Sequence, residues 1–121
     1  MKVKVAVRAD ASISIGSGHV HRCLTLTDQL LRSNYEVTFF TRPNNGHLVN
    51  LIKSRGCHVR LLPLILDESF NGDDCVTWPE SYAIEDARQT ILCAGDELYD
   101  WMIVDHYGID SPWEIFTKGI Y

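Results

Sequence analysis

The sequence predicts an α/β domain with a doubly wound parallel sheet, that is, a sheet with helices on both faces. Short runs rich in β-branched and aromatic residues alternate along the chain with stretches whose apolar residues recur at helical spacing. The connections between successive strands are long enough to hold a helix, and such crossovers favour parallel strands. With 121 residues, we expect a single domain over 1–121.

The first strand and the turn after it carry the most informative pattern. Residues 2–7 alternate valine with Lys or Ala, which predicts a strand, and the chain then passes through Gly16 and Gly18. A helix is expected to open near His19 and to run to about Arg32, with leucines on one broad face. The first N–H groups of a helix lack partners within it and lie at the positive end of its dipole. Because glycines allow close approach, this turn predicts a site for a negatively charged ligand group.

The next elements repeat the alternation of strand and helix. Residues 35–41 predict a second strand by their β-branched and aromatic content, and the turn 42–46 contains Pro, Asn and Gly. A helix is expected over 47–55, which Gly56 ends, and a third strand is expected over 57–61.

The second half of the chain begins with an expected long loop over 63–79, which is rich in Asp, Asn, Gly and Pro. Apolar residues at near-helical spacing predict a helix over 80–98. Residues 99–105 predict a fourth strand whose centre is apolar without alternation, which is typical of a strand buried on both faces. A further helix is expected around Trp113.

Composition narrows the class of protein. No apolar run approaches the roughly 20 residues of a membrane span, and the early charges do not fit a secretion signal, so we expect no membrane partner and a cytoplasmic location. The four cysteines form no Cys-x-x-Cys pair and are expected to be structural thiols, with no metal site. The net charge of -5 and the lack of a basic cluster argue against a nucleic-acid partner.

Polar residues follow two strands at their expected carboxyl ends, where parallel sheets bind ligands. In the second of these loops, Asp105 is open to two interpretations, a cap for the backbone beyond the strand or a member of the site. His106 is equally compatible with a surface turn. Tyr107 can bury its ring and point its hydroxyl at a polar ligand.

His19 is the candidate general base in the first loop. The positive end of the helix dipole favours the neutral imidazole that a base requires, and a capping or packing role is the alternative. His21 faces away from His19 on a helix, so the two do not form a metal site. Arg8 and Asp10 can form an ion pair that shapes the loop, or Arg8 can reach a phosphate or a sugar oxygen.

Two separated motifs carry a resemblance to a known family. The first comprises Arg8-Ala-Asp-Ala-Ser12, Ile15-Gly-Ser-Gly-His19 and Arg22-Cys-Leu24. The second is Asp100-Trp-Met-Ile-Val-Asp-His-Tyr-Gly-Ile-Asp110, followed by Trp113-Glu114. In this order they resemble the nucleotide-sugar hydrolases of pseudaminic acid biosynthesis, the PseG family. The middle of the chain, from about 44 to 97, matches only in its βα pattern.

The resemblance implies a Rossmann-like domain that forms the N-terminal half of a two-domain GT-B enzyme. It also implies hydrolysis of UDP-2,4-diacetamido-2,4,6-trideoxy-β-L-altropyranose to the free sugar and UDP, without a metal or other cofactor. His19 would be the general base that takes a proton from water as it attacks the anomeric carbon, and Tyr107 would hold water or sugar in position. The remaining motif residues are expected to contact the substrate or shape its loops: Arg8, Asp10, Gly16, Gly18, Arg22, Asp105 and His106.

Length is where the chain departs from the family. In the two-domain architecture the second domain supplies most contacts to the nucleotide, whereas this sequence stops at Tyr121. We therefore expect a fragment, a truncated or split gene product, or a chain completed by a separate C-terminal half, with little activity alone. The alternatives are the acceptor-side domain of a glycosyltransferase and a non-catalytic fragment that binds sugar nucleotides.

Overall fold

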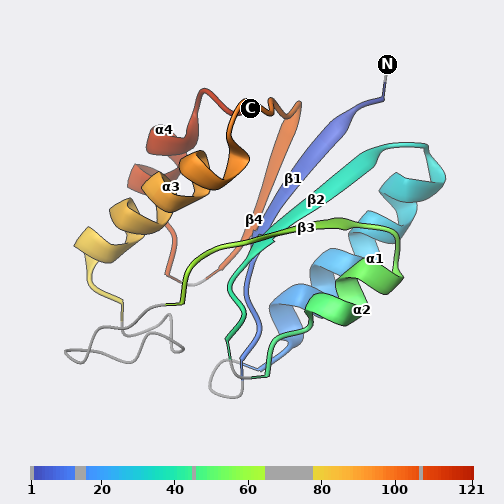
Figure 1. Ribbon diagram of the computed structural model, residues 1–121, viewed down its shortest axis with the longest axis horizontal. Helices are drawn as coiled ribbons and strands as arrows, with labels where there is room; N and C mark the ends of the chain where they lie inside the picture. The colour runs from blue at the N-terminus through green and yellow to red at the C-terminus, as the bar shows by residue number, and fades with distance from the viewer. Residues whose placement is uncertain (1, 13–15, 45, 65–77, 107) are drawn as a thin grey trace.

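The computed structural model describes residues 2–12, 16–44, 46–64, 78–106 and 108–121. Within them the chain alternates strands and helices (Figure 1): β1 (Lys4–Ala9), α1 (Gly18–Arg32), β2 (Glu36–Thr41), α2 (Val49–Ser54), β3 (His58–Leu61), α3 (Glu80–Ala94), β4 (Trp101–Asp105) and α4 (Ser111–Thr117). None of these helices is long and apolar enough to cross a membrane.

The described strands form one parallel sheet in the order β3-β2-β1-β4. This is the order of the first four strands of a Rossmann-type doubly wound sheet. Helices α1 and α2 lie on one face of the sheet, and α3 and α4 lie on the other (Figure 1). The predicted α/β class, the parallel sheet and the helices on both faces are therefore confirmed.

Two apolar cores hold the layers together. The core beneath α1 and α2 takes most of its buried residues from β1, β2 and these helices, and these include Val5, Val7, Ala9, Val20, Leu24, Val37, Phe39 and Ile52. The core on the opposite face contains Ala6, Phe40, Leu62, Ala94, Tyr99 and Ile120. Alternate residues of β1 and β2 thus enter opposite cores, as the two-residue period of a strand requires. Each fully buried Val, Leu or Phe contributes about 1.5–3 kcal/mol of burial free energy.

The boundaries of two helices differ from the sequence prediction. The helix expected over 80–98 ends at Ala94, because Gly95 takes a positive φ of 60° and the chain turns toward β4. The helix expected over 47–55 is confined to Val49–Ser54. Most of the loop expected over 63–79 lies outside the described residues.

The prediction that the fourth strand is buried on both faces is wrong. Among the described strands β4 has a neighbour, β1, on one side only. Trp101, its first residue, is 66% exposed, and Ile103 is half-buried beside a small apolar groove shared with Leu26 and Leu30 of α1. The apolar run is explained by Met102 and Ile103, which pack against the cores on opposite faces of the sheet. These side chains are only partly buried, because β4 lies at the edge of the described sheet.

Candidate functional site

Residues from the two sequence motifs meet at the carboxyl edge of the sheet. β1 and β4 are neighbours, with Ala9 opposite Asp105, so the loops that follow them lie side by side. His19, the second residue of α1, is buried, and its Nδ1 lies 2.6 Å from Oδ1 of Asp105. The two residues are 86 positions apart in the chain. The structure therefore brings the candidate base and an acidic residue of the second motif into direct contact.

Arg22 completes this cluster from one turn further along α1. Its guanidinium donates from Nε to Oδ2 of Asp105 and from Nη2 to Oδ1, both at 2.8 Å. Nη2 also lies 3.2 Å from Nδ1 of His19. The hydrogen bonds from Arg22, followed by the contact with His19, hold the pKa of Asp105 below its usual value. Asp105 is thus an ionised side chain in a polar cluster rather than a simple cap for the strand end.

Arg8 and Asp10 lie behind this cluster in a buried ion network. Arg8 donates from Nη1 and Nη2 to Asp10, at 2.7 and 3.0 Å, and from Nε and Nη2 to Asp86, at 3.0 and 2.6 Å. Its Nη1 also donates to the carbonyl oxygen of Phe40 at 3.3 Å. These bonds occupy all five N–H groups of a side chain with no exposed surface. Arg8 therefore has no donor left for a phosphate or sugar oxygen, and of its two predicted roles the structure supports the ion pair.

Asp10 is the acceptor that ties three segments together. Besides Arg8, it accepts from the backbone N–H of Arg42 at 2.9 Å, from the hydroxyl of Thr41 at 3.2 Å and from Nε2 of His106 at 2.8 Å. Burial alone would raise the pKa of Asp10, but the charge of Arg8 and the bond from His106 hold it well below its usual value. Asp10 is 1% exposed, so it shapes the loops and is not available at the surface.

His106 is buried rather than exposed on a surface turn. Its Nδ1 accepts the backbone N–H of Gly108 at 3.0 Å, so the ring proton sits on Nε2 and is donated to Asp10. Burial lowers the pKa of His106, and the nearby charge of Arg8 acts in the same direction. The neutral ring thus fixes the beginning of the loop after β4.

Asp86, on α3, is a member of the buried network that the sequence does not predict. It is fully buried, and it accepts from Nη2 of Arg42 at 2.5 Å and from Nε1 of Trp113 at 2.8 Å in addition to Arg8. The available signal was an acidic residue on the apolar face of a helix, beside Ala83 and Ala87. Two arginines and two aspartates thus balance in charge within the described part of the network.

Aromatic rings cover the outer side of this network. The guanidinium carbon of Arg42 lies 5.8 Å from the ring centroid of Trp78 and 5.9 Å from that of Tyr82. Trp78 also contacts the ring of His106, with centroids 4.7 Å apart. Such cation–π contacts favour a guanidinium that is withdrawn from water.

The glycines of the first motif have open surroundings in the described structure. Gly16 has a φ of 78° and exchanges two backbone hydrogen bonds with Ser12, which closes the loop. A side-chain carbon added at Gly16 or Gly18 would meet nothing within 4 Å. Packing therefore does not require a glycine at Gly18, the first residue of α1. Tyr107, the second predicted catalytic residue, lies outside the described residues.

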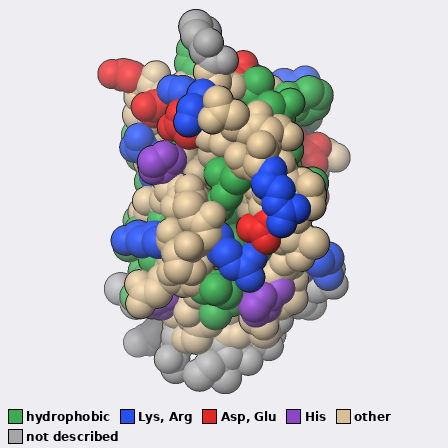
Figure 2. All heavy atoms as spheres, turned by 90° about the vertical axis from the view of Figure 1, so that its right-hand side faces the viewer, with side chains coloured by type: hydrophobic (Ala, Val, Ile, Leu, Met, Phe, Trp, Pro, Cys, Tyr) green, Lys and Arg blue, Asp and Glu red, His purple; other side chains and the backbone are tan. Residues whose placement is uncertain are grey.

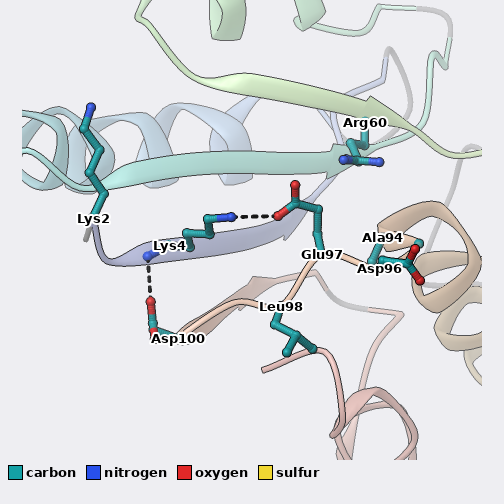
Figure 3. Close-up of a pocket in the computed structure, with 9 residues that line it drawn as sticks. Lys2, Lys4, Arg60, Ala94, Asp96, Glu97, Leu98 and Asp100 are labelled. Atoms are coloured by element: carbon teal, nitrogen blue, oxygen red, sulfur yellow. Dashed lines mark hydrogen bonds and ion pairs between the residues drawn. The ribbon is translucent and has the colours of Figure 1, made fainter.

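Two other surfaces carry charged side chains of both signs. A hollow of about 540 Å³ lies at the opposite, amino end of the sheet (Figure 3), where the ammonium group of Lys4 pairs with Glu97 at 2.8 Å. Basic and acidic side chains are balanced in its described lining, which contains no histidine. On the face over α1 and α2 basic and acidic side chains are interspersed (Figure 2), and Arg55 pairs there with Asp28 at 2.7 Å.

Comparisons of the chain with protein-family models, with curated proteins and with solved structures gave no match. The geometry described above and the resemblance of the two motifs are therefore the basis for a functional assignment.

Proposed function

We propose that this chain is the water-activating half of a cytoplasmic nucleotide-sugar hydrolase that releases UDP from UDP-2,4-diacetamido-2,4,6-trideoxy-β-L-altropyranose. The observation that carries the proposal is the 2.6 Å contact between Nδ1 of His19 and Oδ1 of Asp105. It joins the two motifs on which the resemblance rests, and it does so at the sheet edge where doubly wound folds bind ligands.

The reaction needs a base, an oriented water and a positive environment for the leaving group. In the proposed step the water oxygen forms a bond to the anomeric carbon as the bond from that carbon to the UDP oxygen breaks. UDP leaves with the electron pair, and His19 takes the proton of the water. Since UDP is a good leaving group, it requires stabilisation of negative charge more than a proton, and a pair of catalytic carboxylates is not needed.

The cluster also suggests which predicted residues face the substrate. Gly18 is the first residue of α1, where N–H groups without a partner inside the helix favour an anionic ligand, and Gly16 shapes the loop before it, since its own N–H is donated to Ser12. Arg22, whose side chain is 62% exposed, adds positive charge at the same place. Tyr107 remains a candidate from the resemblance alone. Arg8 and Asp10 are assigned to the buried framework and are left out of the proposed substrate contacts.

We further propose that a second domain supplies most of the nucleotide contacts, as the resemblance implies. The test uses a chimera in which residues 1–121 precede the nucleotide-binding half of a characterised hydrolase of that family. Binding of UDP to the chimera serves as the control for the folding of the second half. We expect UDP release from the nucleotide sugar by the chimera and little release by residues 1–121 alone.

His19→Ala in the chimera is expected to abolish UDP release while leaving UDP binding intact, because the base is lost and the nucleotide site is not. A chimera that binds UDP and releases none from the sugar nucleotide contradicts the proposal. A product that forms only with an added sugar acceptor identifies a transferase instead, and binding of the sugar nucleotide without any product identifies a binding module.

A further inference from the structure

Two polar atoms that lie near Nδ1 of His19 have opposite character. Oδ1 of Asp105, at 2.6 Å, can only accept a hydrogen bond because this carboxylate is ionised. Nη2 of Arg22, at 3.2 Å, can only donate one. The proton on the neutral imidazole therefore has two possible positions, and each neighbour favours a different one.

The distances decide between the two positions. If Nδ1 lacked a proton, its lone pair would face a carboxylate oxygen at 2.6 Å, which is repulsive. If Nδ1 carries the proton, the same contact is a short, charge-assisted hydrogen bond. Arg22 already donates Nη2 and Nε to the two oxygens of Asp105 at 2.8 Å. The contacts therefore favour the proton on Nδ1.

We propose that Asp105, fixed by the guanidinium of Arg22, is a positioning residue that holds His19 in its Nδ1–H tautomer. Nε2 is then the unprotonated nitrogen, and under the proposed function it is the atom that accepts the proton of the attacking water. The role in water activation rests on the proposed function. The tautomer itself rests only on the contacts of His19, Asp105 and Arg22.

His106 provides an internal reference for this inference, because the same structure assigns it the opposite tautomer. Its Nδ1 accepts from Gly108, and its Nε2 donates to Asp10. The two histidines are therefore expected to differ in the protonated nitrogen within one spectrum. A disturbance of the whole fold would alter both, whereas loss of the Asp105 contact would alter His19 alone.

The experiment is a long-range ¹H–¹⁵N correlation spectrum of residues 1–121 with ¹⁵N-labelled histidine, recorded at a pH where the rings are neutral. For the wild type we expect a protonated Nδ1 on His19 and a protonated Nε2 on His106. In Asp105→Asn the amide oxygen is expected to accept from Nε of Arg22, which turns the amide NH2 group toward Nδ1 of His19. The proton of His19 is then expected to move to Nε2, because this NH2 group and Nη2 of Arg22 are both donors toward Nδ1. Asp105→Glu retains a carboxylate and is expected to keep the Nδ1 proton.

Asp28→Asn is the matched control, because Asp28 pairs with Arg55 on the surface and has no contact with the site. It should leave both histidines unchanged. A protonated Nε2 on wild-type His19, or an unchanged His19 in Asp105→Asn, overturns the inference. A changed His106 signal would reveal that Asp105→Asn does not fold. In that case the position of the His19 proton in the wild type and in Asp105→Glu still tests the inference.

In the chimera, Asp105→Asn is expected to lower kcat by about 10²–10⁴-fold, the range that a positioned base contributes, with little change in KM. The two proposals fail separately. A wild-type chimera that releases no UDP rejects the proposed function and leaves the tautomer result standing. A chimera that releases UDP with an Nε2–H His19 rejects the positioning role of Asp105.

Discussion

The buried carboxylate of Asp86 offers the sharpest test of how this fold is held together. It accepts four hydrogen bonds, two from Arg8 and one each from Arg42 and Trp113. In Asp86→Asn an NH2 group replaces one of the two carboxylate oxygens, with little change in the volume of the side chain. Since each oxygen accepts two of these bonds, two donors lose their acceptor and face the N–H groups of the amide instead.

The expected cost follows from this loss of acceptors. Removing one partner of a buried ion pair typically costs about 3–5 kcal/mol, because the remaining charge stays buried. Two lost hydrogen bonds to charged groups, at about 1.5–3 kcal/mol each, give a similar sum. Small domains have a free energy of unfolding of about 5–15 kcal/mol, so this loss is a large fraction of the whole.

Urea unfolding followed by far-ultraviolet circular dichroism measures the effect. With a slope of about 2 kcal/mol per molar urea, the midpoint of Asp86→Asn is expected to fall by about 2 M. Asp28→Asn removes the charge of a partly exposed pair with Arg55 and should cost at most about 1 kcal/mol. The reasoning is refuted if the unfolding free energy of Asp86→Asn lies within about 1 kcal/mol of the wild-type value. It is also refuted if the urea midpoint of Asp86→Asn is no lower than that of Asp28→Asn.

Two further predictions concern the pH dependence of stability and the proposed substrate contacts. Because the pKa of His106 is lower in the folded than in the unfolded protein, wild-type stability should decline as the pH falls below about 6.5, by at most about 1.4 kcal/mol per pH unit. His106→Gln should flatten this part of a plot of unfolding free energy against pH, and parallel curves for the two proteins would contradict the assignment. Gly18→Ala should change the unfolding free energy by no more than about 1 kcal/mol, since the added carbon meets no atom within 4 Å. It should weaken binding of the sugar nucleotide to the chimera, as measured by calorimetry, and unchanged binding would remove Gly18 from the proposed contacts.

The sequence was informative where local pattern determines structure. β2 and β3 begin within one residue of their predicted starts, because β-branched and aromatic runs are local features. His19 and Asp105 could be placed at strand ends of one sheet, but their contact could not be read from the chain. It depends on β4 lying beside β1, an arrangement that joins residues 86 positions apart. The partners of Asp86 were hidden for the same reason, since Arg8 lies 78 positions away.

Asp105 and His106 are consecutive in the chain, and together they connect the buried framework to the site. His106 bonds to Asp10 in the buried network, whereas Asp105 bonds to His19 and Arg22 on α1. Because the bond to Asp10 anchors His106, the carboxylate of the preceding residue, Asp105, is restricted in the positions it can take. The buried network of charged side chains therefore affects His19 indirectly, because it fixes the end of β4, which carries Asp105. The proposed role of His19 as a general base requires such a support, since the lone pair of a base must be oriented before the substrate binds.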